Sequence, residues 1–179
     1  RETYTYVVES DTQARDLLNE IVPPKLFTQK QLILQGSTSV SGFASPHVEW
    51  VEFETELSPH WAYTHQGIER LDRINESEFQ ELIVRQSSSG NKGEIFAEFV
   101  MRSGRHLYVR MTPISEAAGD FRLVITQLLD GGGFVVVDEE EGCRMIVNPK
   151  NIARWNVHPA PEKPMPTPFA WPASYQRVD

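Results

Sequence analysis

The stretch that decides the fold is Ile95–Met111, with the sequence IFAEFVMRSGRHLYVRM. It contains two segments rich in aromatic and aliphatic residues, Ile95–Arg102 and Arg105–Met111. Ser103-Gly104 lies between them, and a two-residue connection that contains glycine suits a β-hairpin. The stretch therefore predicts two antiparallel strands joined by a tight turn.

A two-residue turn also fixes which residues of this hairpin lie opposite one another. It sets Phe99 opposite Tyr108 and Val100 opposite Leu107, giving one aromatic and one aliphatic cross-strand pair. Apolar residues occupy both faces of the hairpin, whereas a half-exposed strand alternates apolar with polar residues. We therefore expect the hairpin to lie in the interior of a sheet.

Four further short strands are expected after the hairpin. They span Phe121–Leu129, Phe134–Val137, Met145–Val147 and Ile152–Val157. Turn-forming segments separate them, namely Asp130–Gly133, Asp138–Gly142 and Asn148–Asn151. Short strands with tight turns are typical of small closed or half-open barrels, so the sequence predicts a barrel-like antiparallel meander.

Helix signals are confined to the N-terminal half. Ser10 has capping-box spacing to Gln13, and apolar residues follow at helical intervals until Pro23-Pro24 ends the segment. Asn75 is placed to cap a second helix, with Glu78 at its third position. The helices are predicted over about 11–22 and 76–86.

The remaining strand signal lies at Val51–Leu57, where apolar residues alternate with three glutamates. We expect Gln31–Gln35 to be its antiparallel partner. Together these signals predict an α+β fold that is mostly antiparallel sheet, with two helices in the N-terminal half and a barrel-like meander in the C-terminal half. The predicted division is an α/β N-terminal subdomain at 1–90, the meander at 91–157 and an extended Pro-rich arm at 158–179.

Composition and charge limit the classes of protein to consider. The chain has 179 residues, a formal charge of −8 and one cysteine, which excludes an internal disulfide. Residues 1–90 carry 14 acidic but 7 basic side chains, a balance that repels a phosphate backbone. No apolar run is long enough to cross a bilayer, so we expect no membrane partner and a cytoplasmic location, although a removed N-terminal leader would leave no trace here.

Signatures of familiar catalytic sites are missing from the sequence. It contains no phosphate-binding glycine loop, no H-E-x-x-H and no G-x-S-x-G, so we predict no cofactor and no metal. The run Asp138–Glu141 lacks calcium-loop spacing and is typical of a solvated turn. Cys143 follows a turn glycine and precedes Arg144, which leaves either a reactive thiol or, as we favour, a partly buried strand cysteine.

One segment is richer in reactive groups than the rest. Between His47 and His65, three histidines and a glutamate lie among aromatic residues, which are suitable parts for an acid/base pocket. If the protein is an enzyme, the candidate catalytic residues are His47, Glu49, His60 and His65. The aromatic residues here that could bind a ligand or partner are Trp50, Trp61 and Tyr63.

The C-terminal arm combines six prolines between His158 and Pro172 with aromatic residues. Proline keeps such a segment extended, and disordered tails are usually poor in aromatic residues. We expect Phe169, Trp171 and Tyr175 to bind either this chain or a partner.

These observations favour a non-catalytic binding or adaptor protein. It would recognise another protein, or a second copy of itself, through an acidic surface and the aromatic, Pro-rich arm. The first alternative is a small-molecule enzyme or ligand-binding domain that uses the His47–His65 cluster. The second is a nucleic-acid-binding regulator that uses the hairpin residues Arg102, Arg105 and Arg110, although we do not expect nucleic acid to be the partner.

Overall fold

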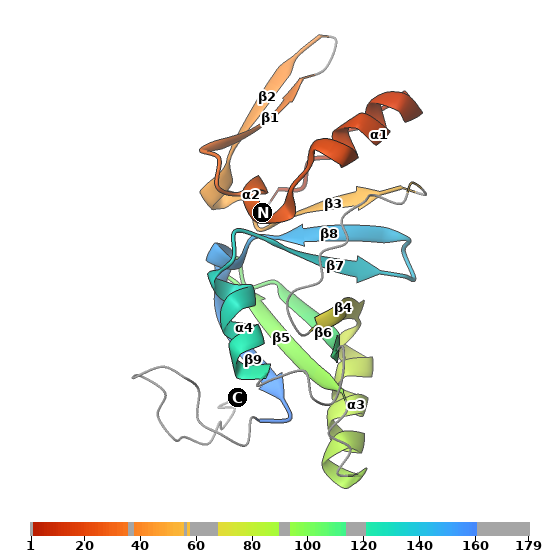
Figure 1. Cartoon of the computed structure of the whole chain (residues 1–179), viewed down its shortest axis with the longest axis vertical. Helices are drawn as coiled ribbons and strands as arrows, with labels where there is room; N and C mark the ends of the chain where they lie inside the picture. The colour runs from red at the N-terminus through yellow and green to blue at the C-terminus, as the bar shows by residue number, and fades with distance from the viewer. Residues whose placement is uncertain are drawn as a thin grey trace.

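A computed structural model describes residues 2–35, 38–55, 57, 68–89, 94–113 and 121–160. Figure 1 shows an α+β protein in which the β1–β2 hairpin projects from one end of the long axis and α3 forms the other end. The helices are α1 (Asp11–Glu20), α2 (Pro23–Leu26), α3 (Glu76–Ser89) and α4 (Phe121–Asp130), with short 3-10 turns η1 (Ser45–His47) and η2 (Pro149–Asn151). The predicted α+β class is confirmed.

Seven strands form one curled sheet, a half-barrel, in the order β3-β8-β7-β4-β6-β5-β9. They are β3 (Trp50–Glu54), β4 (Ile68–Ile74), β5 (Ile95–Met101), β6 (His106–Pro113), β7 (Phe134–Asp138), β8 (Cys143–Val147) and β9 (Ile152–His158). The sheet is mixed, because β4 and β7 run parallel while its other neighbours are antiparallel. The sheet combines strands from the predicted N-terminal subdomain (1–90) with strands from the predicted meander (91–157).

Both helices predicted from capping signals are present. The Ser10 hydroxyl accepts a hydrogen bond from the Gln13 backbone N–H, and the Asn75 side chain accepts one from Glu78 at 2.9 Å. Each cap satisfies a backbone donor that the helix itself leaves unpaired. Pro23-Pro24 follows α1 and also forms the first turn of α2. The missing N–H of proline costs nothing there, because the first N–H groups of a helix have no partner within it.

The segment Phe121–Leu129, predicted as a strand, is instead the helix α4. Ile125 and Leu128 are buried in the core, whereas Gln127 between them is exposed. Burial at a spacing of three residues is helical, because a strand would bury alternate residues. A short apolar run does not by itself distinguish the two structures, and its length of ten residues favours the helix.

The predicted pairing of Gln31–Gln35 with Val51–Leu57 is also wrong. Gln31–Gln35 is β1, and it pairs with β2 (Val40–Ala44) to form a separate two-stranded sheet. The other segment forms β3, which pairs with β8, far away in the sequence. Its predicted alternation does hold, since Val51 and Phe53 are half-buried while Glu52 is exposed.

The central hairpin forms as β5 and β6, but its register differs by one residue from the prediction. Phe99 lies opposite Leu107, and the Met101 and Arg105 backbones are hydrogen-bonded at 2.8 Å. The connection therefore contains three residues, with Gly104 at φ +83°. That left-handed conformation closes three-residue hairpins and favours glycine. The predicted interior position is confirmed, since β4 and β9 flank the pair.

The core has two parts on opposite faces of the sheet. The larger part includes Phe99, Phe134 and Met145, and α4 contributes Ile125 and Leu128 to it. The smaller part packs α3 on the other face through Ile74, Phe79 and Phe96. Because both faces of β5 are covered, this strand is almost fully apolar.

Candidate functional site

The turn between β7 and β8 carries a dense group of carboxylates. Glu139, Glu140 and Glu141 are exposed, while Asp138 is buried and its carboxylate accepts the Glu141 backbone N–H at 3.0 Å. Gly142 has φ +63°, a conformation that allows the chain to return into β8. Exposed glutamates of the neighbouring strand β3 extend the group. We call this set the acidic rim: Glu52, Glu54, Asp138, Glu139, Glu140 and Glu141.

Two arginines of β4 counter part of this negative charge. The Arg73 guanidinium lies 3.3 Å from Asp138, 3.7 Å from Glu141 and 3.8 Å from Glu52. Arg70 forms ion pairs with Glu139 and with Asp72 on its own strand. The ion pairs of these two arginines involve four of the six rim carboxylates, and the rim keeps a net negative charge even with Arg144 of β8, which lies opposite Phe53 and Val137.

Sequence reasoning singled out the turn but missed these arginines. A signal existed, because Arg70 and Arg73 are the only Lys or Arg residues between Gln31 and Val84. Their partners depend on the parallel pairing of β4 with β7, which places Asp72 opposite Val137. Such long-range pairing is not encoded in local periodicity.

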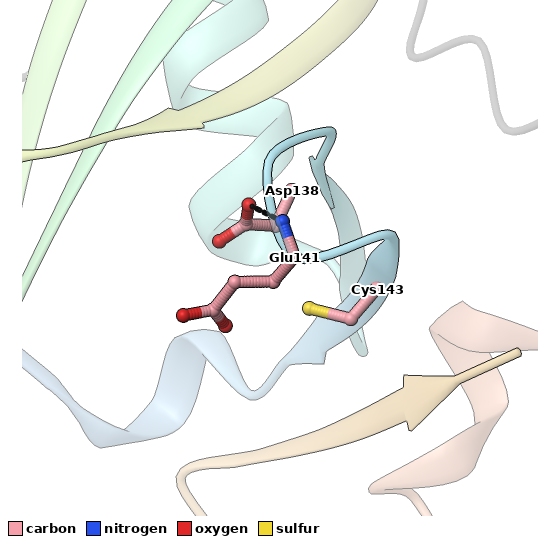
Figure 2. A group of neighbouring side chains, drawn as sticks. All are labelled: Asp138, Glu141 and Cys143. Carbon is pink, nitrogen blue, oxygen red and sulfur yellow. Dashed lines mark hydrogen bonds between the residues drawn. The ribbon is translucent and has the colours of Figure 1, made fainter.

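Asp138, Glu141 and Cys143 bring their ligand atoms within 4.8 Å of one another, close enough to hold one metal ion (Figure 2). Burial, followed by the nearby carboxylates of Asp138, Glu52 and Glu141, raises the pKa of Cys143 to about 11. Metals bind the thiolate, so an ion at this position would have to displace the thiol proton. The Arg73 guanidinium already supplies a cation to both carboxylates. The group is best described as an ion-pair network, and the buried Cys143 does not match the reactive-thiol alternative.

Glu49, predicted as a catalytic carboxylate, holds two chain segments together. Its side chain accepts hydrogen bonds from the backbone and hydroxyl of Ser103 at 2.9 Å each, and from Arg105 at 2.7 and 2.9 Å. The Arg105 guanidinium also lies 3.7 Å from the centre of the Trp50 ring, a cation–π geometry. Residues from two alternative predicted sites, Glu49 and Trp50 from one and Arg105 from the other, thus form one cluster.

The remaining residues of the predicted acid/base cluster are not brought together among the described residues. His47 ends η1 and is exposed, while Glu49 directs its hydrogen bonds to Ser103 and Arg105. The other predicted residues lie outside the described part of the chain: His60, Trp61, Tyr63, His65, Phe169, Trp171 and Tyr175.

The three arginines of the nucleic-acid alternative lie in different surroundings. Arg102 is exposed in the β5–β6 turn, and its backbone N–H donates to Asn151 at 2.8 Å. Arg105 is bound to Glu49, and Arg110 lies 3.8 Å from Glu78 of α3.

A polar cluster on β5, β6 and β9 was not predicted. The Glu98 carboxylate accepts hydrogen bonds from Asn156 at 2.6 Å and Arg154 at 3.3 Å, and it contacts His106 Nδ1 at 2.7 Å. The Tyr108 hydroxyl contacts the same His106 nitrogen at 3.3 Å. This arrangement brings a carboxylate and a hydroxyl to the same imidazole nitrogen. It links three neighbouring strands.

These features define the class of protein as an α+β protein built on a mixed half-barrel sheet, with an acidic rim at one turn. Among the described residues, no helix combines the length and apolar character that crossing a bilayer requires. Comparisons with models of known families, with curated proteins and with solved structures found no match.

Proposed function

We propose that this protein is a non-catalytic binding protein whose acidic rim recognises a basic segment of another protein. The observation that carries the proposal is the charge balance of the rim, six carboxylates against the guanidinium groups of Arg70, Arg73 and Arg144. A basic partner segment would meet carboxylates that are held in place by the β7–β8 turn and by β3.

The exposure of the carboxylates supports recognition. Glu139 and Glu141 are 71% and 67% exposed, so a partner can reach them without displacing the core. A shallow, open hollow lined by Glu54, Thr55, Glu141 and Gly142 adjoins them. A single exposed ion pair contributes little affinity, but a group of like charges steers an oppositely charged partner to the surface.

The proposal includes a second contact through the aromatic, Pro-rich arm. Its support is the sequence alone, which combines Phe169, Trp171 and Tyr175 with six prolines between His158 and Pro172, a composition that favours an extended chain. A restrained arm loses less conformational entropy on docking than a flexible tail does. Truncation after Ala160 should therefore weaken binding of the natural partner more than it weakens binding of a short basic peptide.

The rim can be tested with a labelled nonamer of arginine as the probe, at low ionic strength, by fluorescence anisotropy. The rim variant Glu54→Gln/Glu140→Gln removes two exposed carboxylates. Its matched control is Asp16→Asn/Glu20→Gln on α1, which changes the net charge equally on another surface. We expect the dissociation constant to rise about tenfold for the rim variant and less than about threefold for the control.

If the rim variant and the control lose the same affinity for the arginine nonamer, the peptide responds to the total charge of the protein. The proposal would then be wrong. An affinity that does not fall as salt is added would also contradict it, because exposed charges are screened.

A further inference from the structure

The strand β1 has a sequence that is the same in both directions, Gln31-Leu32-Ile33-Leu34-Gln35. Its one neighbour in the sheet is β2, and no described residue pairs with its other edge. Ile33 is 63% exposed, at the centre of the strand. The rings of Tyr4 and Tyr6 pack against Phe43 of β2, but a two-stranded sheet is marginally stable in water, so an added strand would stabilise β1 and β2.

The edge strands of the large sheet provide a comparison within the same molecule. β3 carries Glu52 and Glu54, and β9 carries Arg154 and is followed closely by Pro159. Charged side chains and proline are common devices that prevent an edge strand from pairing with another chain. Neither β1 nor β2 contains a charged residue or a proline. The small sheet alone thus has edge strands without such protection.

We propose that β1 pairs with β1 of a second copy of this chain, antiparallel and about a twofold axis through Ile33. Because the sequence is a palindrome, this register sets Ile33 opposite Ile33, Leu32 opposite Leu34 and Gln31 opposite Gln35. Every pair joins side chains of like kind, as an isologous interface requires. The two small sheets then form one sheet of four strands.

The absence of charge on β1 also favours a second copy of this chain as its pairing partner. The paired strands are uncharged, and the adjacent Lys30 would fall opposite residue 36, a glycine, rather than opposite another lysine. No like charges therefore meet across the axis, whereas two copies of an edge such as β3 would bring glutamates together. Five residues of strand bury little area, so we expect a weak dimer with a dissociation constant on the order of 100 µM.

This inference does not depend on the proposed function, because β1 and the acidic rim lie on different sheets. Oxidative cross-linking tests it without requiring a tight dimer. In the Cys143→Ser background, Ile33→Cys would place two thiols on Cα atoms about 4.5–5.5 Å apart across the axis, which a disulfide can span. The matched control is Val40→Cys on β2, equally exposed at 66%, whose two copies would lie more than about 14 Å apart.

At a protein concentration near 100 µM, with copper phenanthroline as the oxidant, we expect the Ile33→Cys variant to form covalent dimer at least tenfold faster than the Val40→Cys variant. In the unmodified chain, Ile33→Lys should abolish the concentration-dependent dimer measured by sedimentation equilibrium, while Val40→Lys should not. Equal cross-linking rates would instead indicate random collision or contact through the sheet face, and would overturn the proposal. A chain that stays monomeric at 1 mM would overturn it as well.

Discussion

Glu49 shows how a reactive side chain can serve the fold. Its carboxylate, 10% exposed, joins the residue before β3 to the β5–β6 turn through Ser103 and Arg105. We expect Glu49→Ala to lower the free energy of unfolding by about 2 kcal/mol, because the Ser103 N–H loses its acceptor. Urea denaturation measures the change. Glu54→Ala, at an exposed position on β3, is the control and should change it by less than about 0.5 kcal/mol.

The same carboxylate gives a pH dependence with a defined sign. Burial tends to raise the pKa of Glu49, but the hydrogen bonds from Ser103 and Arg105 outweigh burial and hold the pKa below its ordinary value of 4.5. A carboxylate with a lowered pKa stabilises the folded state above its unfolded pKa, and this contribution is lost as the pH falls through the folded pKa. The stability difference between the original chain and Glu49→Gln should therefore be constant near neutrality and shrink below pH 4.5. A difference that grows on acidification would contradict this assignment.

Cys143 should be inert in the folded protein. Burial and the surrounding carboxylates raise its pKa to about 11, so little thiolate exists at pH 8. We expect a thiol reagent to react with the native protein at least a hundredfold more slowly than with the protein in 6 M guanidinium chloride. Equal rates in the two conditions would show that the thiol is accessible and ionised in the folded state.

At the scale of elements, α4 provides a test that separates a helix from a strand. A helix buries Leu128 and exposes Gln127, whereas a strand that buried Ile125 would also turn residue 127 inward. Leu128→Ala should lower the free energy of unfolding by about 2–5 kcal/mol, and Gln127→Ala should leave it nearly unchanged. Denaturant unfolding of the two variants measures both effects, and the reverse order would exclude the helix.

The contact between α2 and the segment before β7 depends on a glycine. A Cβ atom at Gly132 would lie 1.7 Å from the Pro24 carbonyl oxygen, so any side chain there forces the backbones apart. A Cβ at Gly142 would meet no atom within 4 Å, although its φ of +63° is unfavourable for alanine. We expect Gly132→Ala to cost about 3 kcal/mol or more and Gly142→Ala about 1 kcal/mol. Thermal unfolding of the two variants checks this, and equal costs would contradict the close approach.

The structures that sequence could predict are those that local contacts determine. The caps at Ser10 and Asn75 act within three residues, and both helices begin where predicted. The partner of β3 is a distant segment, which alternation cannot identify, whereas β1 pairs with the nearby β2, a segment where no strand was predicted. The register of the central hairpin failed by one residue because a three-residue turn closed by Gly104 replaced the expected two-residue turn.

In the candidate site, too, the sequence shows the local features, whereas contacts between distant segments become visible only in the structure. The carboxylates of the β7–β8 turn are visible in the sequence as a run of charge, but their role depends on Arg73, which reaches them through strand pairing. Glu49 and Arg105 were predicted for two different functions, and their pairing became visible only once β3 and the β5–β6 turn were placed side by side.

At the scale of the whole molecule, the two proposed surfaces belong to different parts of the fold. The β7–β8 turn carries the acidic rim at one end of β8, while η2 follows the other end. Under the proposed function, a basic segment would be attracted to the acidic rim. The projecting β1–β2 hairpin forms a sheet separate from the one that carries the acidic rim, so the two proposals concern different surfaces.

The most direct test of the acidic rim as the recognition surface is a nuclear magnetic resonance titration of the whole, isotope-labelled protein with the arginine nonamer. The account predicts that the largest amide shift changes fall on the rim, at residues 138–142 and 52–54, and that they disappear as salt is added. Shift changes centred on α1 or on the β1–β2 sheet, or spread evenly over all acidic residues, would contradict it.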